Sequence, residues 1–172
     1  MKDLLTSTRD LPPIDEIRRR VHYDPLTGKM TWIRAKANGI KPGTEVGGVN
    51  AQGYRSFSYR QHVIKVHRLA FAFTHGRWPE PYCDHINGDR LDNRACNLRE
   101  CDPSQNCQNR PAFKNNTAGA KGVSYDRDSR KWRSRVWVGG SVKFSRRFSH
   151  LEDAVAFVKQ AREQLHGEFA RH

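Results

Sequence analysis

The sequence contains no apolar run that approaches the roughly 20 residues needed to cross a bilayer. Its first 30 residues alternate charges with prolines and lack the apolar centre of a secretory signal peptide. No segment combines a wide apolar helical face with a lysine-rich opposite face, which helices that lie on membranes require. These absences argue against a membrane partner and predict a protein of the cytoplasm.

Cysteine is scarce, and it forms no C-x-x-C pair. The four cysteines Cys83, Cys96, Cys101 and Cys107 all lie within 25 residues. Structural zinc sites normally present two close pairs of ligands. The sequence therefore favours reduced thiols over a structural zinc site, and a zinc site that includes His85 stays open as the alternative.

Acidic residues are few, because 31 Lys and Arg face 18 Asp and Glu, which gives a formal net charge of +13. With 10% aromatic residues this composition favours a folded protein with nucleic acid as its partner, not a small-molecule substrate. Residues 1–82 carry 14 bases against 7 acids, residues 83–116 carry five of each, and residues 117–172 carry 12 against 6. Two basic flanks around a neutral centre suit an enzyme that grips phosphates beside a divalent cation.

The N-terminal half predicts a short helix and then antiparallel strands. Pro12-Pro13 and two acids open a helix at Ile14, which we expect to run to Arg20. Residues 66–75 place apolar side chains at helical spacing, and Gly76 closes that helix. Strands are expected at residues 29–33, 45–49, 54–59 and 63–66.

The C-terminal half predicts two separate units. Residues 82–109 have the pattern strand, loop, strand, helix, and the polar stretch 110–117 is typical of a linker. Gly139-Gly140 predicts a hairpin turn, and Ser149-x-x-Glu152 predicts a capping box at the start of an amphipathic helix. That helix would cover the apolar face of a sheet and leave its basic face open. The expected strands of this sheet are residues 121–126, 131–138 and 142–148.

Chemistry concentrates in the segment that begins Asp84-His85-Ile86-Asn87-Gly88-Asp89. Asp84 and Asn106 offer oxygen ligands that suit a hard cation, and a hairpin plus one helical turn can bring them onto one ion. His85 beside such a cation would stay neutral near pH 7 and could accept a proton from water. Each residue also has an ordinary explanation, a surface imidazole for the histidine and a plain turn for Asn-Gly.

The motifs as a set resemble the HNH homing endonucleases of bacteriophages, which have the His-Me finger or ββα-metal fold. The matching residues are Val66-His67-Arg68-Leu69, Asp84-His85-x-Asn87-Gly88-Asp89, Asp92-Asn93, Asn97-Leu98-Arg99 and Asn106. The C-terminal segment is similar to an APETALA2/ethylene-response-factor DNA-binding domain. It matches at Asn116-Thr117, Lys121-Gly122-Val123-Ser124, Lys131-Trp132, Phe148, Glu152-Asp153-Ala154 and Gly167-Glu168-Phe169-Ala170.

The HNH resemblance implies a catalytic set. His85 matches the general base, and Asp84 and Asn106 match the ligands of one Mg²⁺ or Mn²⁺ ion. Asn97 matches a scaffold residue that ties the loop between the two strands. Asn106 stands where the family name has its final histidine, and this is a variant within the family.

The C-terminal resemblance implies a sheet laid in the major groove of double-stranded DNA. Trp132 has the other strand parity and is expected in the core. Arg68, near the HNH motif, is either a phosphate contact or part of a helix start that packs on the motif. The expected DNA-binding residues are Arg68, Lys121, Arg127, Lys131, Arg133, Arg135 and Trp137.

The sequence thus predicts an α+β protein in which N-terminal antiparallel strands lead into a ββα-metal nuclease, followed by a three-stranded sheet on one helix. The nuclease region is 1–109 with its core at about 66–109, the linker is 110–117, and the DNA-binding domain is 118–172. The predicted function is site-specific DNA cleavage, which requires that water can reach His85. The alternatives are a DNA-binding regulator with an inactive nuclease module and, third, an RNA-binding protein.

Overall fold

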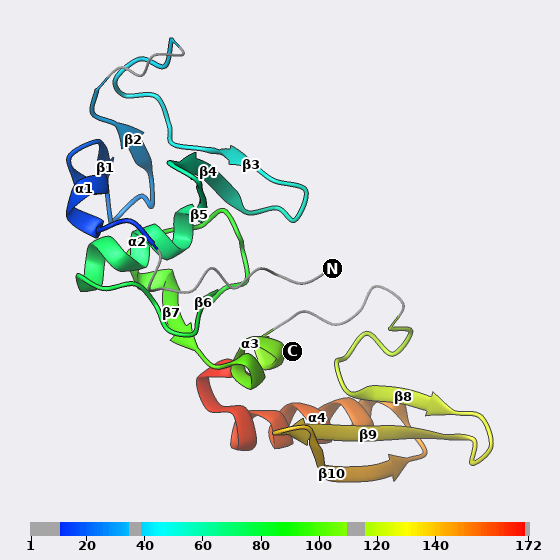
Figure 1. Cartoon of the computed structure of the whole chain (residues 1–172). Helices are drawn as coiled ribbons and strands as arrows, with labels where there is room; N and C mark the ends of the chain where they lie inside the picture. Colours follow the sequence, from blue (N-terminus) through cyan, green and yellow to red (C-terminus); the bar gives the residue numbers. More distant parts are fainter. Residues whose placement is uncertain (1–10, 35–38, 110–115, 171–172) are drawn as a thin grey trace. The chain divides into compact units, whose positions relative to one another are not determined.

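The structure, a computed structural model, describes residues 11–34, 39–109 and 116–170 (Figure 1). It is a mixed α and β fold with antiparallel sheets. The chain divides into two compact units, Met1–Cys101 and Asp102–His172, which are described separately. Most of the predicted linker lies outside the described residues, and the domain boundaries given above stay predictions.

The first unit contains three small antiparallel sheets, formed by β1 with β2, by β3, β4 and β5, and by β6 with β7. A 3-10 helix, η2, directly precedes β7. The elements are α1 (Ile14–Arg18), β1 (Val21–Tyr23), β2 (Met30–Trp32), β3 (Gly48–Val49), β4 (Arg55–Tyr59), β5 (His62–Lys65), α2 (Val66–His75), β6 (Tyr82–His85), η2 (Ala95–Asn97) and β7 (Leu98–Cys101).

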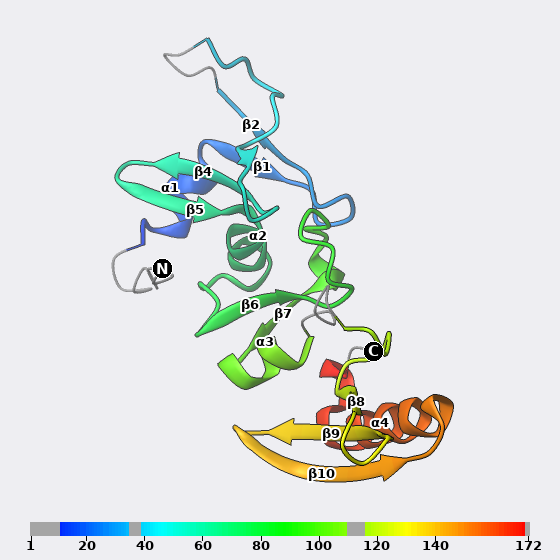
Figure 2. The same ribbon diagram turned by 90° about the vertical axis from the view of Figure 1, so that its right-hand side faces the viewer.

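Helix α2 is the centre of this unit, and Figure 2 shows it between the β4–β5 hairpin and the β6–β7 pair. Its predicted bounds are confirmed. Gly76 ends it with a φ of 72°, and its N–H donates to the carbonyl of Ala72. The side chains of Leu69 and Phe71 are buried in a core that also contains Leu98 of β7. The hairpin of β6 and β7 is therefore fixed against a rigid helix.

The N-terminal helix is shorter than the sequence predicts. α1 ends at Arg18, and Val21–Tyr23 form a strand that pairs with β2, with Val21 opposite Trp32. Val21 is buried, so pairing and burial outweigh the local preference that favoured helix up to Arg20. Only Gly48–Val49 of the strand expected at 45–49 are extended, as the two-residue β3.

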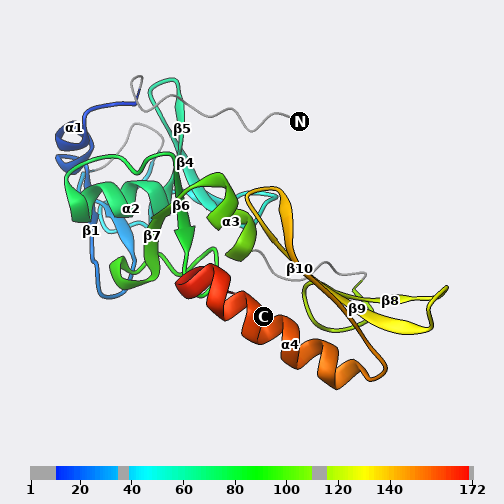
Figure 3. The ribbon, with the colours of Figure 1, turned by 90° about the horizontal axis from the view of Figure 1, so that it is seen from below.

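The second unit is a sheet in the order β10-β9-β8 with helix α4 running along it (Figure 3). Ser134 and Val136 of β9 are buried toward α4, and the hydroxyl of Ser134 donates to the carbonyl of Ala154. The predicted alternation along this strand is confirmed, since Trp132 packs on the core while Trp137 is exposed. The elements are α3 (Pro103–Asn109), β8 (Val123–Asp126), β9 (Lys131–Val138), β10 (Ser141–Phe148), α4 (Leu151–His166) and η3 (Gly167–Phe169).

The start of α4 differs from the prediction. His150 is its N-cap and makes no side-chain cap, so the capping box expected at Ser149 and Glu152 is wrong. The helix also buries two basic residues, Arg162 and His166, on the face that we expected to be apolar. Across the described ranges, no helix is both long enough and apolar enough to span a bilayer.

Candidate active site

The predicted base and one predicted metal ligand lie at the end of strand β6. His85 is the last residue of that strand and lies opposite Leu98, and Asp84 lies opposite Arg99. The guanidinium of Arg99 is 3.6 Å from the Asp84 carboxylate, and both side chains are largely buried. The hairpin therefore holds a carboxylate and an imidazole side by side on one rigid strand.

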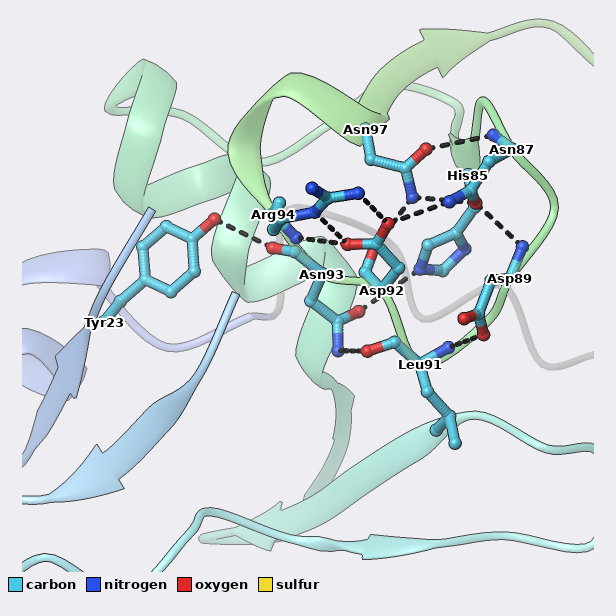
Figure 4. Close-up of polar contacts among 9 residues, drawn as sticks. All are labelled: Tyr23, His85, Asn87, Asp89, Leu91, Asp92, Asn93, Arg94 and Asn97. Atoms are coloured by element: carbon cyan, nitrogen blue, oxygen red, sulfur yellow. Dashed lines mark hydrogen bonds and ion pairs between the residues drawn. The ribbon is translucent and has the colours of Figure 1, made fainter. Parts of the chain in front are cut away.

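Asn97 ties the loop that joins β6 to β7 (Figure 4). Its side-chain oxygen accepts from the N–H of Asn87, and its amide donates to the side chain of Asn87 and to the carbonyl of Asp92. The carboxylate of Asp92 accepts from Asn87 and from Arg94, whose hydrogen bond is the main reason that the pKa of Asp92 falls to about 2. The loop beside His85 is thus held from within.

Asn93 is the direct partner of the His85 ring. Its Oδ1 lies 3.2 Å from His85 Nε2, while its own Nδ2 donates to the carbonyl of Leu91. Figure 4 shows Asn93 between His85 and Tyr23, whose hydroxyl donates to the Asn93 carbonyl. Because the Leu91 contact fixes which amide atom faces the ring, Nε2 of a neutral His85 carries the proton and Nδ1 has the lone pair.

His85 is more buried than the sequence indicates, with 3% of its surface exposed. Burial lowers its pKa from the ordinary 6.5, against an opposing hydrogen bond from Asn93. The sequence analysis expected a neutral histidine because of a nearby cation. In this structure desolvation alone provides that neutrality, but the required access of water is not met by the exposed surface.

A second histidine and a tyrosine pack against His85. The ring centroids of His67 and His85 are 4.8 Å apart, and Tyr54 lies 5.2 Å from His67 and 6.1 Å from His85. His67 is fully enclosed, and burial sets its pKa well below the usual value. Both imidazoles are therefore uncharged at neutral pH, which lets them pack closely.

Asn106, the other predicted metal ligand, lies on α3 in the second unit. Lys121 holds the end of that helix, since its Nζ donates to the carbonyls of Cys107 and Gln108. The buried Arg162 of α4 donates to the same Gln108 carbonyl. Because the two units are described separately, the sharing of one ion by Asp84 and Asn106 stays a prediction.

Comparison with known proteins identifies the family. The HNH endonuclease family model matches residues 65–108. Protein 3.8 of Escherichia phage T7 is 34% identical over 117 residues, which cover 66% of this chain and 96% of that protein. The chain belongs to the family of protein 3.8 and carries an HNH endonuclease domain. No solved structure matches.

The HNH segment crosses the boundary between the two units. It begins at Lys65, the last residue of β5, and ends at Gln108 within α3. Of the predicted catalytic set, Asp84, His85 and Asn97 are together on the β6–β7 hairpin and its η2 turn. The helix that ends the HNH segment belongs instead to the compact unit that contains the C-terminal sheet.

The predicted DNA-binding residues near the HNH segment make internal contacts. Arg68 donates to the carbonyls of Pro79 and Pro81, which is the helix-start packing that the sequence left as one alternative. Lys121 bonds the end of α3, as described above. For neither residue is a role in DNA binding tested by these contacts.

The other predicted DNA-binding residues lie on or near the face of the sheet turned away from α4. Arg133 lies opposite Ser124 and Arg147, and Arg135 lies opposite Ser145. Asp126 and Arg147 form an ion pair on this face. Trp137 is 51% exposed. The face is thus basic and aromatic and is built by Lys131, Arg133, Arg135 and Trp137, with Arg127 in the turn after β8.

Zinc ligands do not gather in the described residues, among which no group of three His, Cys, Asp or Glu side chains could hold a metal ion. The four cysteines are free thiols. Burial raises the pKa of Cys83 far above its usual value, and Cys101 is buried as well.

Sequence reasoning missed the roles of Asn93 and Tyr54. Asn93 is part of the Asp92-Asn93 motif that carried the resemblance, and this was a usable signal, but nothing local indicates that its amide faces His85. Tyr54 is separated from His85 by 31 residues of sequence and reaches it only because β4 and β6 both pack against α2. Contacts of this kind follow from tertiary packing.

Proposed function

We propose that this protein is a site-specific DNA endonuclease of the homing type, which hydrolyses a phosphodiester bond with His85 as general base. The observation that carries the proposal is the hydrogen bond between His85 and Asn93 inside the matched HNH segment. It gives a buried, neutral imidazole one defined tautomer, as a general base needs.

In the proposed reaction, Nδ1 of His85 takes a proton from a water molecule as its oxygen attacks the phosphorus in line. The new P–O bond forms as the bond to the 3′ oxygen breaks, and the departing oxygen gains a proton from solvent. Asn97 acts as a positioning residue, because its bonds to Asn87 and Asp92 keep the loop around His85 in place. A general base of this kind contributes about 100- to 10,000-fold to the rate.

The proposed metal is one Mg²⁺ or Mn²⁺ ion in a ββα-metal arrangement of β6, β7 and α3. The donors fit this ion class, since the Asp84 carboxylate and the Asn106 amide are hard oxygen ligands. When bound, the ion would stabilise negative charge on the phosphate and the departing oxygen. Arg99, 3.6 Å from Asp84, keeps this carboxylate on the hairpin.

We propose that the second unit selects the DNA site in the manner of APETALA2-type domains. Support comes from its open sheet face, where Arg133 and Arg135 project beside the exposed Trp137. Arginine reads guanine in the major groove by paired hydrogen bonds, and tryptophan can pack on a sugar or a thymine methyl. Double-stranded DNA is accordingly the proposed partner.

A second candidate function is a DNA-binding regulator whose nuclease module is inactive. The burial of His85 favours it, because 3% exposure leaves bulk water almost no contact with the ring. Under the first proposal, DNA or metal binding must therefore admit an ordered water molecule to Nδ1. The two candidates differ in turnover and not in DNA binding.

The test is cleavage of phage and plasmid DNA with Mg²⁺ or Mn²⁺, compared with EDTA. We expect cutting at defined positions with metal, none in EDTA, and at least a 100-fold slower rate for His85→Ala with DNA binding retained. His22→Ala is the matched control, because His22 is an exposed histidine of β1 in the same unit. Binding without cutting by the wild-type protein would favour the regulator.

A further inference from the structure

Two cations lie on the ring of Tyr54, next to the proposed base. Lys65 Nζ is 4.9 Å from the ring centroid, and the Arg90 guanidinium carbon is 4.8 Å from it. The same ring lies 6.1 Å from the ring of His85. One aromatic side chain therefore links a pair of positive charges to the site of the proposed chemistry.

The two cations come from different elements and are held in place. Lys65 ends β5, opposite Ser56 of β4, while Arg90 lies in the loop between β6 and β7. Arg90 Nη1 also donates to the carbonyl of Gln52, at 2.6 Å. Contact with an aromatic face stabilises each cation and restricts its side chain without neutralising it.

Acidic partners do not offset this charge in the part of the chain that the structure describes. Neither Lys65 nor Arg90 forms a salt bridge there, in contrast to Arg55 and Arg60, which pair with Glu45 and Glu16. Strands β4 and β5 contain no Asp or Glu at all. The positive charge beside His85 is therefore available to an external anion.

The sheet face that carries Lys65 is also suited to a polyanion. Phe57 and Ile64 of this sheet are buried, and the alternate positions Ser56 and Ser58 point the other way, as do Lys65 and the exposed Val63. Serine hydroxyls and basic side chains are common donors to phosphate oxygens in protein–DNA contacts. This face thus offers donors and no competing carboxylate.

We propose that Lys65 and Arg90, held on the ring of Tyr54, bind a phosphate of the DNA backbone beside the one that is cleaved. This inference rests on the proposed nuclease function and adds a substrate-binding site to it. The ammonium of Lys65 supplies a point charge, and the remaining N–H groups of Arg90 donate to the phosphate oxygens. Such a contact fixes the strand relative to His85 and carries no base specificity.

The test compares Lys65→Gln and Arg90→Gln with two controls that lose the same charge at exposed positions of the same unit, Lys41→Gln and Arg19→Gln. DNA binding is measured in EDTA as a function of salt, with the full-length protein. Each test variant should reduce the slope of log K against log salt by about 0.9, the value for one lost phosphate contact on duplex DNA. In cleavage assays we expect KM to rise about tenfold with kcat nearly unchanged, because the contact is made equally before and during the reaction.

Tyr54 supplies a further test of the site. Tyr54→Phe keeps the ring and should behave like the wild type, while Tyr54→Leu removes the platform of both cations and should weaken binding as the cation variants do. Equal melting temperatures establish that each variant is folded. Should Tyr54→Leu fail to fold, the comparison of Lys65→Gln and Arg90→Gln with their controls decides alone.

The outcomes separate this inference from the proposed function. Salt slopes equal to those of the controls would overturn the phosphate site even if the wild type cuts DNA. A fall in kcat with unchanged KM would also overturn it, since the cations would then act on the chemical step. Reduced slopes in a protein that binds but never cuts would support the site and refute the nuclease.

Discussion

Nε2 of His85 lies 3.2 Å from Oδ1 of Asn93, and a carbonyl of the same loop fixes the orientation of the Asn93 amide. This pair decides which nitrogen of the imidazole can accept a proton. Asn93 is itself 4% exposed and receives a hydrogen bond from Tyr23 on its carbonyl. A side chain that never touches DNA thus sets the chemical state of the one that is proposed to act.

Replacing Asn93 tests that relationship. Asn93→Ala should lower kcat about 10- to 100-fold, as loss of an orienting partner does elsewhere, with little change in KM. Asn93→Asp keeps an acceptor on the same atom and should restore most of the rate. Asn116→Ala, which removes a side chain that bonds its own turn in the other unit, is the control.

A readout independent of activity is the tautomer of His85. NMR chemical shifts of the ring, assigned by comparison with His85→Ala, should report protonated Nε2 in the wild type and a mixture of tautomers in Asn93→Ala. Protonated Nδ1 in the wild type would contradict the assignment, whatever the rates are.

The buried histidines should make stability depend on pH. The pKa of His67 lies well below 6.5 in the folded protein because of burial, so below pH 6.5 the unfolded chain binds more protons than the folded one. The free energy of unfolding should therefore be constant above about pH 7 and fall as the pH drops below 6.5. Melting curves from pH 5 to 8 measure this.

His67→Gln should flatten that pH dependence, and His22→Gln at an exposed position of β1 should not. His85, whose pKa is also lowered by burial, accounts for part of the dependence that remains. A wild-type melting temperature that is independent of pH would show that these imidazoles are not buried as described.

Cysteine reactivity should divide into two classes. Cys96 and Cys107 are exposed and should react rapidly with a disulfide reagent, while Cys83 and Cys101 should react only on unfolding. The raised pKa of Cys83 slows it further, because the thiolate is the reacting form. Four slow thiols together with zinc released on unfolding would instead indicate the structural zinc site.

Gly28 should be intolerant of a side chain. It has a φ of 73°, and an added Cβ would lie 2.5 Å from the backbone nitrogen of Arg94 and 2.6 Å from the carbonyl carbon of Asn93. Gly28→Ala should cost about 1 kcal/mol from backbone strain and about 2 kcal/mol more from the clash. Gly43→Ala has a φ of 81° with nothing near the new atom, and it should show the strain alone. Denaturant unfolding compares the two.

The same pair of variants should separate stability from activity. Gly28→Ala displaces the backbone of Asn93 and should reduce cleavage at temperatures where the protein is still folded. Gly43→Ala should leave cleavage unchanged. Equal activities would mean that the β1–β2 turn supports the fold without influencing His85.

Features determined by local sequence were predictable. The spacing of apolar residues and Gly76 gave the bounds of α2, and strand parity placed Trp132 in the core and Trp137 outside it. Gly139-Gly140 turns the hairpin with two positive φ angles, as expected. Each of these depends on residues a few positions apart.

Features determined by distant packing were not predictable. The depth of His85 depends on Tyr54 and His67 from other elements, and the bonds of Arg68 depend on where residues 79–81 pass. The buried Arg162 broke an otherwise amphipathic pattern because its partner, the Gln108 carbonyl, lies 54 residues away. A polar residue with so distant a partner resembles a surface position when only its neighbours in sequence are considered.

The grouping of α3 with the C-terminal sheet limits how such a chain can evolve. An exchange of genes at the 110–117 segment would separate the helix of Asn106 from Lys121 and Arg162, which bond its last carbonyls. A new recognition module would then arrive without the anchor of the helix that ends the HNH segment. A recombination point near Cys101 would keep helix and anchor together, so chimeras joined there should work better than those joined at the segment that looks like a linker.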